Sequence, residues 1–393
     1  MKHYDKSNWK KVRLGDIVDI FSGGTPKTST PEYWNGDILW CTPTDITANE
    51  DKYISDTEQK ISALGLQNSA TRLLPENTLL LCSRATIGAV KIATKPICTN
   101  QGFKNLVCKD VMDTDFLYYY IPKLKPQMIF LASGSTFLEI SKKQLAGIEF
   151  TIPTTKSEQV YIANVLSKID SAITNLQKLI SKQESIKKTT LKLLLEPKSD
   201  WNVFYLGQLG IFYGGLSGKT KNDFIDGNAK YITYNNVYKN IIINPDQLAY
   251  VRISSTEHQN EVFHGDILFT QSSETLEEVG FSSAYMLETH CYLNSFCFGF
   301  RPHKDRIDSI FFAYFTHSNL VRKEIMKAAQ GITRINLSAE RLKKIKIHLP
   351  DIQTQKRIAT QLSEIDAHIE NLKQQLAKQR AIKQGLMDYF FGN

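Results

Sequence analysis

The segment Gly214–Thr220 ends in Gly218-Lys219-Thr220, which is how a phosphate-binding P-loop ends. A P-loop also needs a glycine five residues before its Gly-Lys pair, because the backbone of that turn cradles the phosphates. Tyr213 occupies that position, and no apolar strand ending in Asp stands out as a magnesium-binding partner. The spacing therefore argues against nucleotide hydrolysis.

Other catalytic patterns are missing as well. The chain has no Pro-Pro pair to hold a flipped base during methyl transfer, and its eight His residues include no H-E-x-x-H motif. Neither Pro245-Asp246 nor Pro350-Asp351 is followed by the Glu-x-Lys of a nuclease. The six Cys residues form no CxxC pair, which favours buried free thiols over a zinc site or a disulfide framework. We therefore expect a chain that is not an enzyme and holds no cofactor or metal itself.

Side chains suited to nucleic acid gather instead in the polar loops. Lys, Arg, Ser and Thr can bind phosphates, whereas Gln, Asn, Arg and Glu can read base edges. A single loop of this kind is also typical of an ordinary solvated turn. The DNA-binding candidates in the first half are Lys27, Thr28, Ser29, Ser83, Arg84, Thr86, Asn100, Gln101, Lys104, Ser135 and Thr136. Those in the second half are Ser217, Lys219, Thr220, Lys221, Gln271, Ser272, Ser273, Thr275, Asn294, Thr333 and Arg334.

The framework that must position these loops occurs twice. Trp9 and Trp201 open the two halves, and each is followed by a Leu-Gly pair and then by an aromatic residue with paired glycines. Short β-leaning runs such as 79–82 and 266–269 alternate with Gly, Asn, Asp and Pro, which predicts a twisted β-rich sheet with short helices. One short helix is expected near 115–128, with a counterpart near 308–328. The framework repeats while the loop sequences differ, which suits two modules that read different half-sites.

Each half ends in a long segment whose apolar residues follow a 4-3-4-3 spacing, the pattern of a coiled-coil seam. Two long helices in one chain most simply pair with each other, as an antiparallel coiled coil. Gln183 and Gln379 interrupt the two seams at the same place, and such a polar residue can fix the register. The alternative is that each helix packs only on its own module. The predicted seam residues are Ile162, Leu166, Ile169, Ile173, Leu176 and Ile180, matched by Ile358, Leu362, Ile365, Ile369, Leu372 and Leu376.

These patterns predict an α+β fold of two β-rich modules, each followed by a long helix. We expect the first module at residues 1–155 and its helix at 156–198. The second module then covers 199–350 and its helix 351–393.

Composition and charge leave the partner open. The hydrophobic fraction of 42% and the charged fraction of 22% are typical of a soluble globular protein, and no run approaches the ~18 apolar residues of a membrane span. The N-terminus lacks the apolar stretch of a signal peptide, so we expect a cytoplasmic protein that does not bind membranes. The net charge of +8 permits an anionic partner such as DNA without requiring one.

The order and duplication of the segments resemble the specificity subunit of a type I restriction–modification system over the whole chain. In that family, two target recognition modules each read one part of a split double-stranded DNA sequence, and the paired helices set the spacer. The first-half motifs that carry the resemblance are Leu14-Gly15, Gly23-Gly24-Thr25-Pro26, Pro31-Glu32-Tyr33-Trp34, Thr86-Ile87-Gly88, Asn100-Gln101-Gly102-Phe103 and Ile152-Pro153. The second-half motifs are Gly214–Thr220, Asn294-Ser295-Phe296 and Leu349-Pro350.

The same resemblance implies partners. The helices would dock two DNA methyltransferase (modification) subunits, to which restriction/translocase subunits attach, and S-adenosylmethionine, ATP and Mg would belong to those partners. It also implies a circular pseudo-symmetry, with the segment before Trp9 lying near the end of the second long helix. A competing hypothesis from the residues alone is a tandem coiled-coil scaffold that binds protein and does not read DNA.

Overall fold

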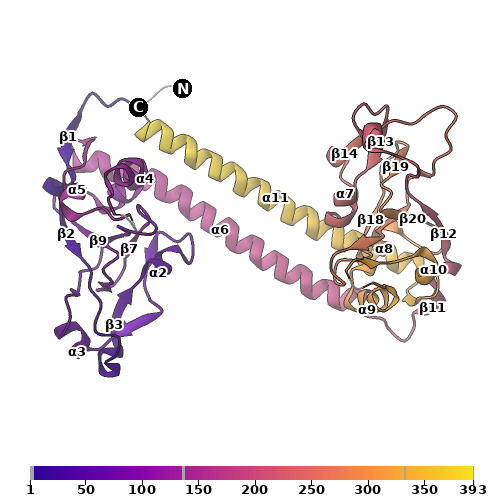
Figure 1. Cartoon of the computed structure of the whole chain (residues 1–393), viewed down its shortest axis with the longest axis horizontal. Helices are drawn as coiled ribbons and strands as arrows, with labels where there is room; N and C mark the ends of the chain where they lie inside the picture. The colour runs from indigo at the N-terminus through magenta and orange to yellow at the C-terminus, as the bar shows by residue number, and fades with distance from the viewer. Residues whose placement is uncertain (1–3, 135–137, 332, 393) are drawn as a thin grey trace. The chain divides into compact units, whose positions relative to one another are not determined.

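The computed structural model describes residues 4–134, 138–331 and 333–392. The chain forms two compact units, unit 1 at residues 1–177 with 375–393 and unit 2 at residues 178–374. Two long helices, α6 (Lys156–Leu195) and α11 (Ile352–Phe391), each contribute to both units (Figure 1). We call the β-rich part of unit 1 before α6 module 1, and the β-rich part of unit 2 between α6 and α11 module 2.

Module 1 is built on a five-stranded sheet of order β2-β9-β6-β7-β4, accompanied by a three-stranded sheet of order β5-β3-β8 and by the pair β1-β10. Its longest helix, α4 (Thr114–Leu131), contacts β7, and both belong to the main core of the unit. The strands are β1 (Trp9–Arg13), β2 (Val18–Ser22), β3 (Trp34–Cys41), β4 (Tyr53–Ile54), β5 (Gln59–Ile61), β6 (Leu79–Leu81), β7 (Val90–Ala93), β8 (Cys98–Thr99), β9 (Lys104–Cys108) and β10 (Glu149–Pro153). The other helices are α1 (Leu14–Ile17), η1 (Pro31–Tyr33), α2 (Pro43–Thr47), α3 (Ala63–Gln67) and α5 (Lys142–Ala146).

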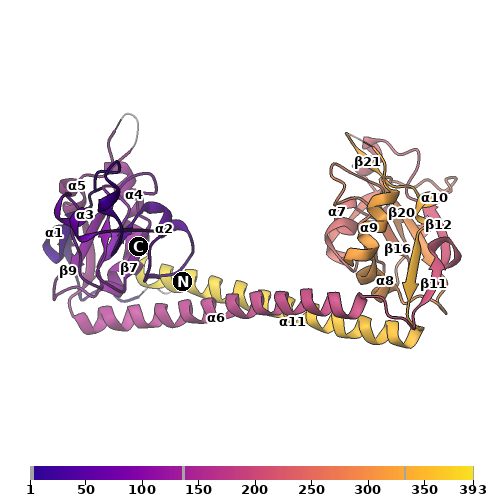
Figure 2. The same ribbon diagram turned by 90° about the horizontal axis from the view of Figure 1, so that it is seen from below.

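Module 2 repeats this plan with sheets of order β12-β20-β16-β18 and β14-β13-β19-β15 and the pairs β11-β22 and β17-β21. The helix α8 (Ser309–Thr316) packs on β16 and β18. Figure 2 labels α8 and β16. The strands are β11 (Asn202–Tyr205), β12 (Gly210–Gly214), β13 (Ala229–Ile232), β14 (Leu248–Val251), β15 (Glu261–Val262), β16 (Ile267–Thr270), β17 (Ser272–Ser273), β18 (Ser282–Ala284), β19 (Cys291–Leu293), β20 (Cys297–Pro302), β21 (Ile335–Asn336) and β22 (Lys346–Leu349). The other helices are η2 (Leu206–Gln208), η3 (Lys221–Phe224), α7 (Tyr234–Lys239), η4 (Pro245–Gln247), α9 (Asn319–Ala328) and α10 (Ala339–Leu342).

The duplication predicted from the sequence is confirmed by strand order and direction. The order β2-β9-β6-β7 of module 1 matches β12-β20-β16-β18 of module 2, and all of these neighbours are antiparallel. The second sheet of each module contains one parallel pair, β3 with β8 and β13 with β19. The predicted α+β architecture of two modules and two long helices is therefore confirmed.

The long helices run antiparallel within each unit. In unit 1, Ile162 shares a core with Phe390. In unit 2, Glu184 pairs with Lys373 at 2.9 Å and Lys187 with Asp366 at 2.5 Å. Residues later in α6 contact residues earlier in α11, which is the antiparallel direction that the coiled-coil prediction requires. All twelve predicted seam residues are buried or half-buried.

The alternative, that each helix packs on its own module, also describes part of the structure. Ile162 and Leu166 lie in the core of module 1, and Ile358 and Leu362 lie in the core of module 2. The first turns of each seam thus anchor the helix to the module that precedes it, and the later turns meet the other helix.

The predicted closeness of the chain start and the end of α11 is confirmed within unit 1. The Tyr4 amide donates to the Tyr389 carbonyl at 3.1 Å, and the Tyr4 ring lies 5.2 Å from the ring of Phe390. Unit 2 has the equivalent arrangement, because Leu195 at the end of α6 and Trp201 share the core that contains Ile358.

One helix prediction is wrong in part. The sequence predicts a short helix over 115–128 and a counterpart over 308–328. The first is α4, which continues through Pro122 and Pro126, but the second is divided into α8 and α9 at His317 and Ser318. Ser318 adopts the extended conformation of an N-cap there, so a new helix starts.

The cysteine prediction is confirmed, because all six are free thiols and five are fully buried. Within the described residues, no helix is both long and apolar enough to cross a bilayer.

Candidate nucleic-acid interface

The turn at residues 99–102 organises the loops of module 1. The Asn100 side-chain oxygen accepts a hydrogen bond from the Gly102 amide at 2.8 Å, which is an Asx turn. The Gly24 amide donates to the Thr99 carbonyl at 2.9 Å. A Cβ on Gly23 would lie 1.9 Å from the Asn100 carbonyl oxygen, so only glycine permits this approach. The paired glycines therefore seat the loop after β2 against this turn.

Two further loops join the same turn. The Ser83 amide donates to the Gly102 carbonyl at 2.8 Å, and the Ile140 amide donates to the Ser83 carbonyl at 3.0 Å. Arg84 and Glu139 form a backbone bridge. Loops that are distant in sequence thus meet at one place in module 1.

Module 2 reproduces this framework with other side chains. The Asn294 side-chain oxygen accepts from the Phe296 amide at 2.9 Å, and a Cβ on Gly215 would lie 2.2 Å from the Asn294 carbonyl oxygen. The Gln271 amide donates to the Phe296 carbonyl at 2.8 Å, and the Leu337 amide donates to the Gln271 carbonyl at 2.8 Å. Phe296 is therefore equivalent to Gly102, and Gln271 to Ser83.

The structure brings many of the sequence-predicted residues to these two loop clusters, but their exposure differs. In module 1, Lys27, Thr28, Ser29, Thr86 and Gln101 are exposed, Arg84 and Asn100 are half-buried, and Ser83 and Lys104 are buried. In module 2, Ser217, Thr220, Lys221, Gln271, Thr275, Thr333 and Arg334 are exposed, Lys219 and Asn294 are half-buried, and Ser272 and Ser273 are buried. Ser135 and Thr136 lie outside the described residues.

The buried candidates hold the loops together from inside. Lys104 forms a 2.7 Å salt bridge with Glu139, which satisfies a charge that would otherwise be costly to bury. Ser83 donates to the Gly102 carbonyl at 3.1 Å, and Ser273 donates to Glu278 at 3.1 Å. These side chains have internal partners, so the geometry assigns them to loop support.

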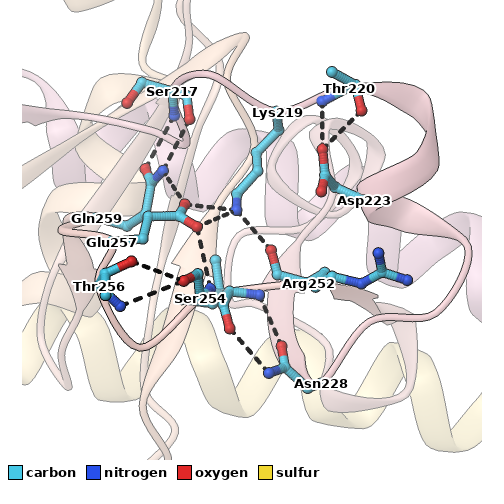
Figure 3. Close-up of polar contacts among 11 residues, drawn as sticks. Ser217, Lys219, Thr220, Asp223, Asn228, Arg252, Ser254, Thr256, Glu257 and Gln259 are labelled. Carbon is cyan, nitrogen blue, oxygen red and sulfur yellow. Dashed lines mark hydrogen bonds and ion pairs between the residues drawn. The ribbon is translucent and has the colours of Figure 1, made fainter.

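The Gly-Lys-Thr segment is held by a separate network of hydrogen bonds and an ion pair (Figure 3). Lys219 lies 2.5 Å from Glu257 and donates to the Arg252 carbonyl at 2.6 Å, and its side chain is only 8% exposed. Thr220 binds Asp223 through both its amide and its hydroxyl at 2.8 Å. Hydrogen bonding from Lys219 lowers the pKa of Glu257, which keeps this ion pair charged.

This geometry gives a second reason against a phosphate-binding loop. The helix that follows the segment, η3, has only four residues of 3-10 geometry, whereas a P-loop opens a long helix. The lysine and the hydroxyl that would face a phosphate already have protein partners. Lys219 and Thr220 therefore brace the loop, while Lys221 remains exposed.

The sequence-based set omits Phe296, which is 52% exposed and lies under the guanidinium of Arg334, with 5.4 Å between the charge centre and the ring centroid. A signal for it exists in the sequence, because Phe296 belongs to the motif Asn294-Ser295-Phe296 that carries the family resemblance. Within the described residues, no three or more His, Cys, Asp or Glu side chains are grouped so as to hold a metal ion.

The family model of the type I restriction modification DNA specificity domain matches this sequence twice, at residues 6–185 and 198–379. The MjaIX specificity subunit of Methanocaldococcus jannaschii is 39% identical over 189 residues, which cover 47% of this chain and 43% of that protein. The MjaVIII specificity subunit of the same organism is 24% identical over 97% of this chain and 91% of its own length. The match thus spans less than half of MjaIX but nearly all of MjaVIII.

Solved structures agree on the fold. The type I restriction–modification S subunit from M. genitalium superposes over 100% of both chains with a TM-score of 0.61 at 18% identity. A second solved structure comes from work on complex assembly and conformational transition of the type I R-M system. It superposes over 100% of both chains with a TM-score of 0.55 at 14% identity.

Proposed function

Because the chain belongs to the family of type I restriction modification DNA specificity domains, with one match in each half, we propose that it is a non-catalytic specificity subunit that reads a bipartite DNA sequence. Module 1 reads one half-site and module 2 reads the other. The observation that carries the proposal is the repeated loop framework. Asn100 and Asn294 anchor equivalent turns, yet the side chains displayed around them differ. Equivalent turns that carry different side chains suit two half-sites of different sequence.

Exposure supports the choice of the residues proposed to contact DNA. Lys27, Lys221 and the exposed hydroxyls are placed to bind phosphates, which fix the register of a protein on the duplex. Gln101 and Gln271 carry amides that can pair with base edges. Both side chains are exposed, and the side-chain oxygen of Gln101 also accepts a hydrogen bond from the Thr25 hydroxyl.

The partners are part of the same proposal. The exposed faces of α6 and α11 dock two DNA methyltransferase subunits, to which restriction subunits attach. S-adenosylmethionine, ATP and magnesium belong to those partners. The proposed functional boundaries are a first recognition domain at 1–155, a helix at 156–198, a second recognition domain at 199–350 and a helix at 351–393, in a cytoplasmic protein.

The experiment that tests the proposal is methylome sequencing of cells that express this chain together with its methyltransferase subunit. We expect a two-part motif with an unspecified spacer, absent when the chain is deleted. Exchange of residues 1–155 for those of a relative should change one half of the motif only. A methylome that is the same with and without this chain would contradict DNA readout and favour a protein-binding scaffold.

Salt dependence separates the two hypotheses in vitro. Phosphate contacts make the affinity for duplex DNA fall steeply as salt rises. The assembled complex should show this fall. If the chain is instead a scaffold that does not read DNA, the partner subunits should bind duplex equally with or without it.

A further inference from the structure

Each module places one arginine against the same point of its framework. In module 1, a Cβ on Gly102 would lie 3.3 Å from Nε of Arg84. In module 2, the guanidinium of Arg334 lies 5.4 Å from the ring centroid of Phe296. Gly102 and Phe296 are equivalent, because the amide of each donates to the side-chain oxygen of its turn asparagine. An arginine therefore covers the third residue of the turn in both modules.

The two arginines reach this point from different loops. Arg84 directly follows Ser83, whose equivalent in module 2 is Gln271, so the equivalent of Arg84 is Ser272. Arg334 instead belongs to the loop that precedes β21. Duplication alone would have placed both arginines in the same loop. The shared position is therefore not a consequence of the duplication, because the two arginines reach the same turn residue from different loops.

Neither guanidinium has a hydrogen-bond acceptor among the described residues. Arg301 and Arg322 of module 2 are occupied by contrast: Arg301 binds Asp266 at 2.7 Å, and Arg322 donates to three backbone carbonyls. Arg72 of module 1 lies over the ring of Phe21, with 4.8 Å between its charge centre and the ring centroid. The carboxylate of Glu139, in the strand bridge with Arg84, is paired with Lys104 instead. Among the residues that the structure describes, half-buried Arg84 thus has none of the hydrogen-bond acceptors that a buried charge normally has.

The backbone beside Arg84 is also strained. Ala85 has a φ of 57°, a left-handed conformation that residues with a Cβ seldom adopt. Strain of this kind persists only where the surrounding structure imposes it, and it concentrates at binding sites. Here it turns the chain directly after the arginine.

We infer that Arg84 and Arg334 are the guanine-reading residues of modules 1 and 2, each donating from its guanidinium fork to O6 and N7 of one guanine. Arginine is the residue best suited to this bidentate contact in the major groove. The flat supports beneath the side chains, a glycine backbone and a phenyl ring, limit the orientations of the guanidinium plane. The inference rests on the proposed function and names which residues carry its specificity.

The test compares the wild type with Arg84→Gln, Arg334→Gln and the control Arg13→Gln, each purified as the complex with its partner subunits. Arg13 is exposed on β1 and pairs with Glu149, so it controls for loss of a positive charge in module 1. The probe is a duplex library with randomised positions, and the bound fraction is sequenced. Arg84→Gln should relax one guanine position by about tenfold or more in one half-site and leave the other half-site intact. Arg334→Gln should do the reverse, and Arg13→Gln should leave both unchanged.

A second pair of variants tests the guanidinium fork. Arg84→Lys and Arg334→Lys keep the charge but lose the fork. If the fork reads guanine through two hydrogen bonds, these variants relax the same position as the Gln variants, although less, because lysine can also donate to the edge of guanine. Full wild-type selection by the lysine variants would overturn the inference that the fork is required.

Three other results would also overturn the inference. They are a wild-type half-site without a guanine, an unchanged motif in the Gln variants, and equal weakening at every position. The proposed function fails separately, if the wild type selects no two-part sequence. The unaffected half-site in each single variant reports that the complex is folded.

Discussion

Gln159 and Gln355, in the first turns of α6 and α11, make the same hydrogen bonds in the two units. Each side-chain oxygen accepts from the backbone amide of an aspartate that caps the helix after the sheet, Asp113 or Asp308. Each side-chain nitrogen donates to a proline carbonyl, that of Pro153 at the end of β10 or that of Pro350 directly after β22. Both glutamines are 1% exposed. These two residues therefore fix the start of each long helix on its module.

Replacing Gln159 by Leu should destabilise unit 1 by about 1–3 kcal/mol, because buried backbone groups lose their partners. Hydrogen–deuterium exchange should rise in peptides from β9 and α4 and stay unchanged in unit 2. Gln353→Leu, on the exposed side of α11, is the control. Unchanged exchange in unit 1 would contradict the anchoring role.

His317 gives unit 2 a dependence on pH. Burial lowers the pKa of His317 to about 4, whereas an unfolded histidine titrates near 6.5. The unfolded state therefore binds the proton more tightly, so the stability of unit 2 should fall as the pH drops from about 6.5 to about 4. His317→Gln should flatten this decline, measured by exchange at several pH values, and the exposed control His303→Gln should not.

At the scale of elements, a tyrosine–aspartate–lysine contact ties both long helices to α4 in unit 1. The Tyr119 hydroxyl of α4 donates to Asp170 of α6 at 2.7 Å, and Asp170 pairs with Lys383 of α11 at 2.6 Å. Burial is the main cause that raises the pKa of Tyr119, so it remains a hydrogen-bond donor at neutral pH.

Unit 2 contains the same contact with the roles of the long helices exchanged. The Tyr314 hydroxyl of α8 donates to Asp366 of α11 at 2.7 Å, and Asp366 pairs with Lys187 of α6 at 2.5 Å. In each unit, one long helix supplies the aspartate and the other supplies the lysine. Polar contacts as well as the apolar seam therefore fix the antiparallel register.

Removal of one lysine should weaken only one of these contacts. Lys383→Met should cost unit 1 about 1 kcal/mol, since the pair is partly screened by solvent, and Lys187→Met should cost unit 2 a similar amount. Exchange in α4 and in α8, respectively, reports the effect. A double-mutant cycle with Asp170→Asn should show coupling to Lys383→Met, and full additivity would argue against a direct pair.

At the scale of the whole molecule, the length of the long helices is the proposed determinant of the spacer. Adding seven residues to both α6 and α11 at matched points preserves the seam and adds about 10 Å of helix. This length is near three base pairs of rise. Methylome sequencing should then show a longer spacer between unchanged half-sites. A variant that methylates the original motif would contradict a ruler role.

The sequence by itself determined the features that depend on local pattern. Heptad spacing predicts α6 and α11, and apolar runs ended by turn residues predict strands such as β6 and β16, because each pattern is set by neighbours along the chain. The internal repeat likewise indicates two equivalent modules. Matched residues such as Asn100 and Asn294 keep the same role in both.

Tertiary structure alone decided which polar side chains stay exposed and which are paired inside the modules. Lys104 and Lys219 look like phosphate ligands in the sequence, but they pair with Glu139 and Glu257, which lie 35 and 38 residues further along the chain. Within the described part of the chain, the guanidinium of Arg84 has no hydrogen-bond acceptor, since the neighbouring Glu139 pairs with Lys104. Availability is a property of contacts between distant segments, and local spacing carries no information about them.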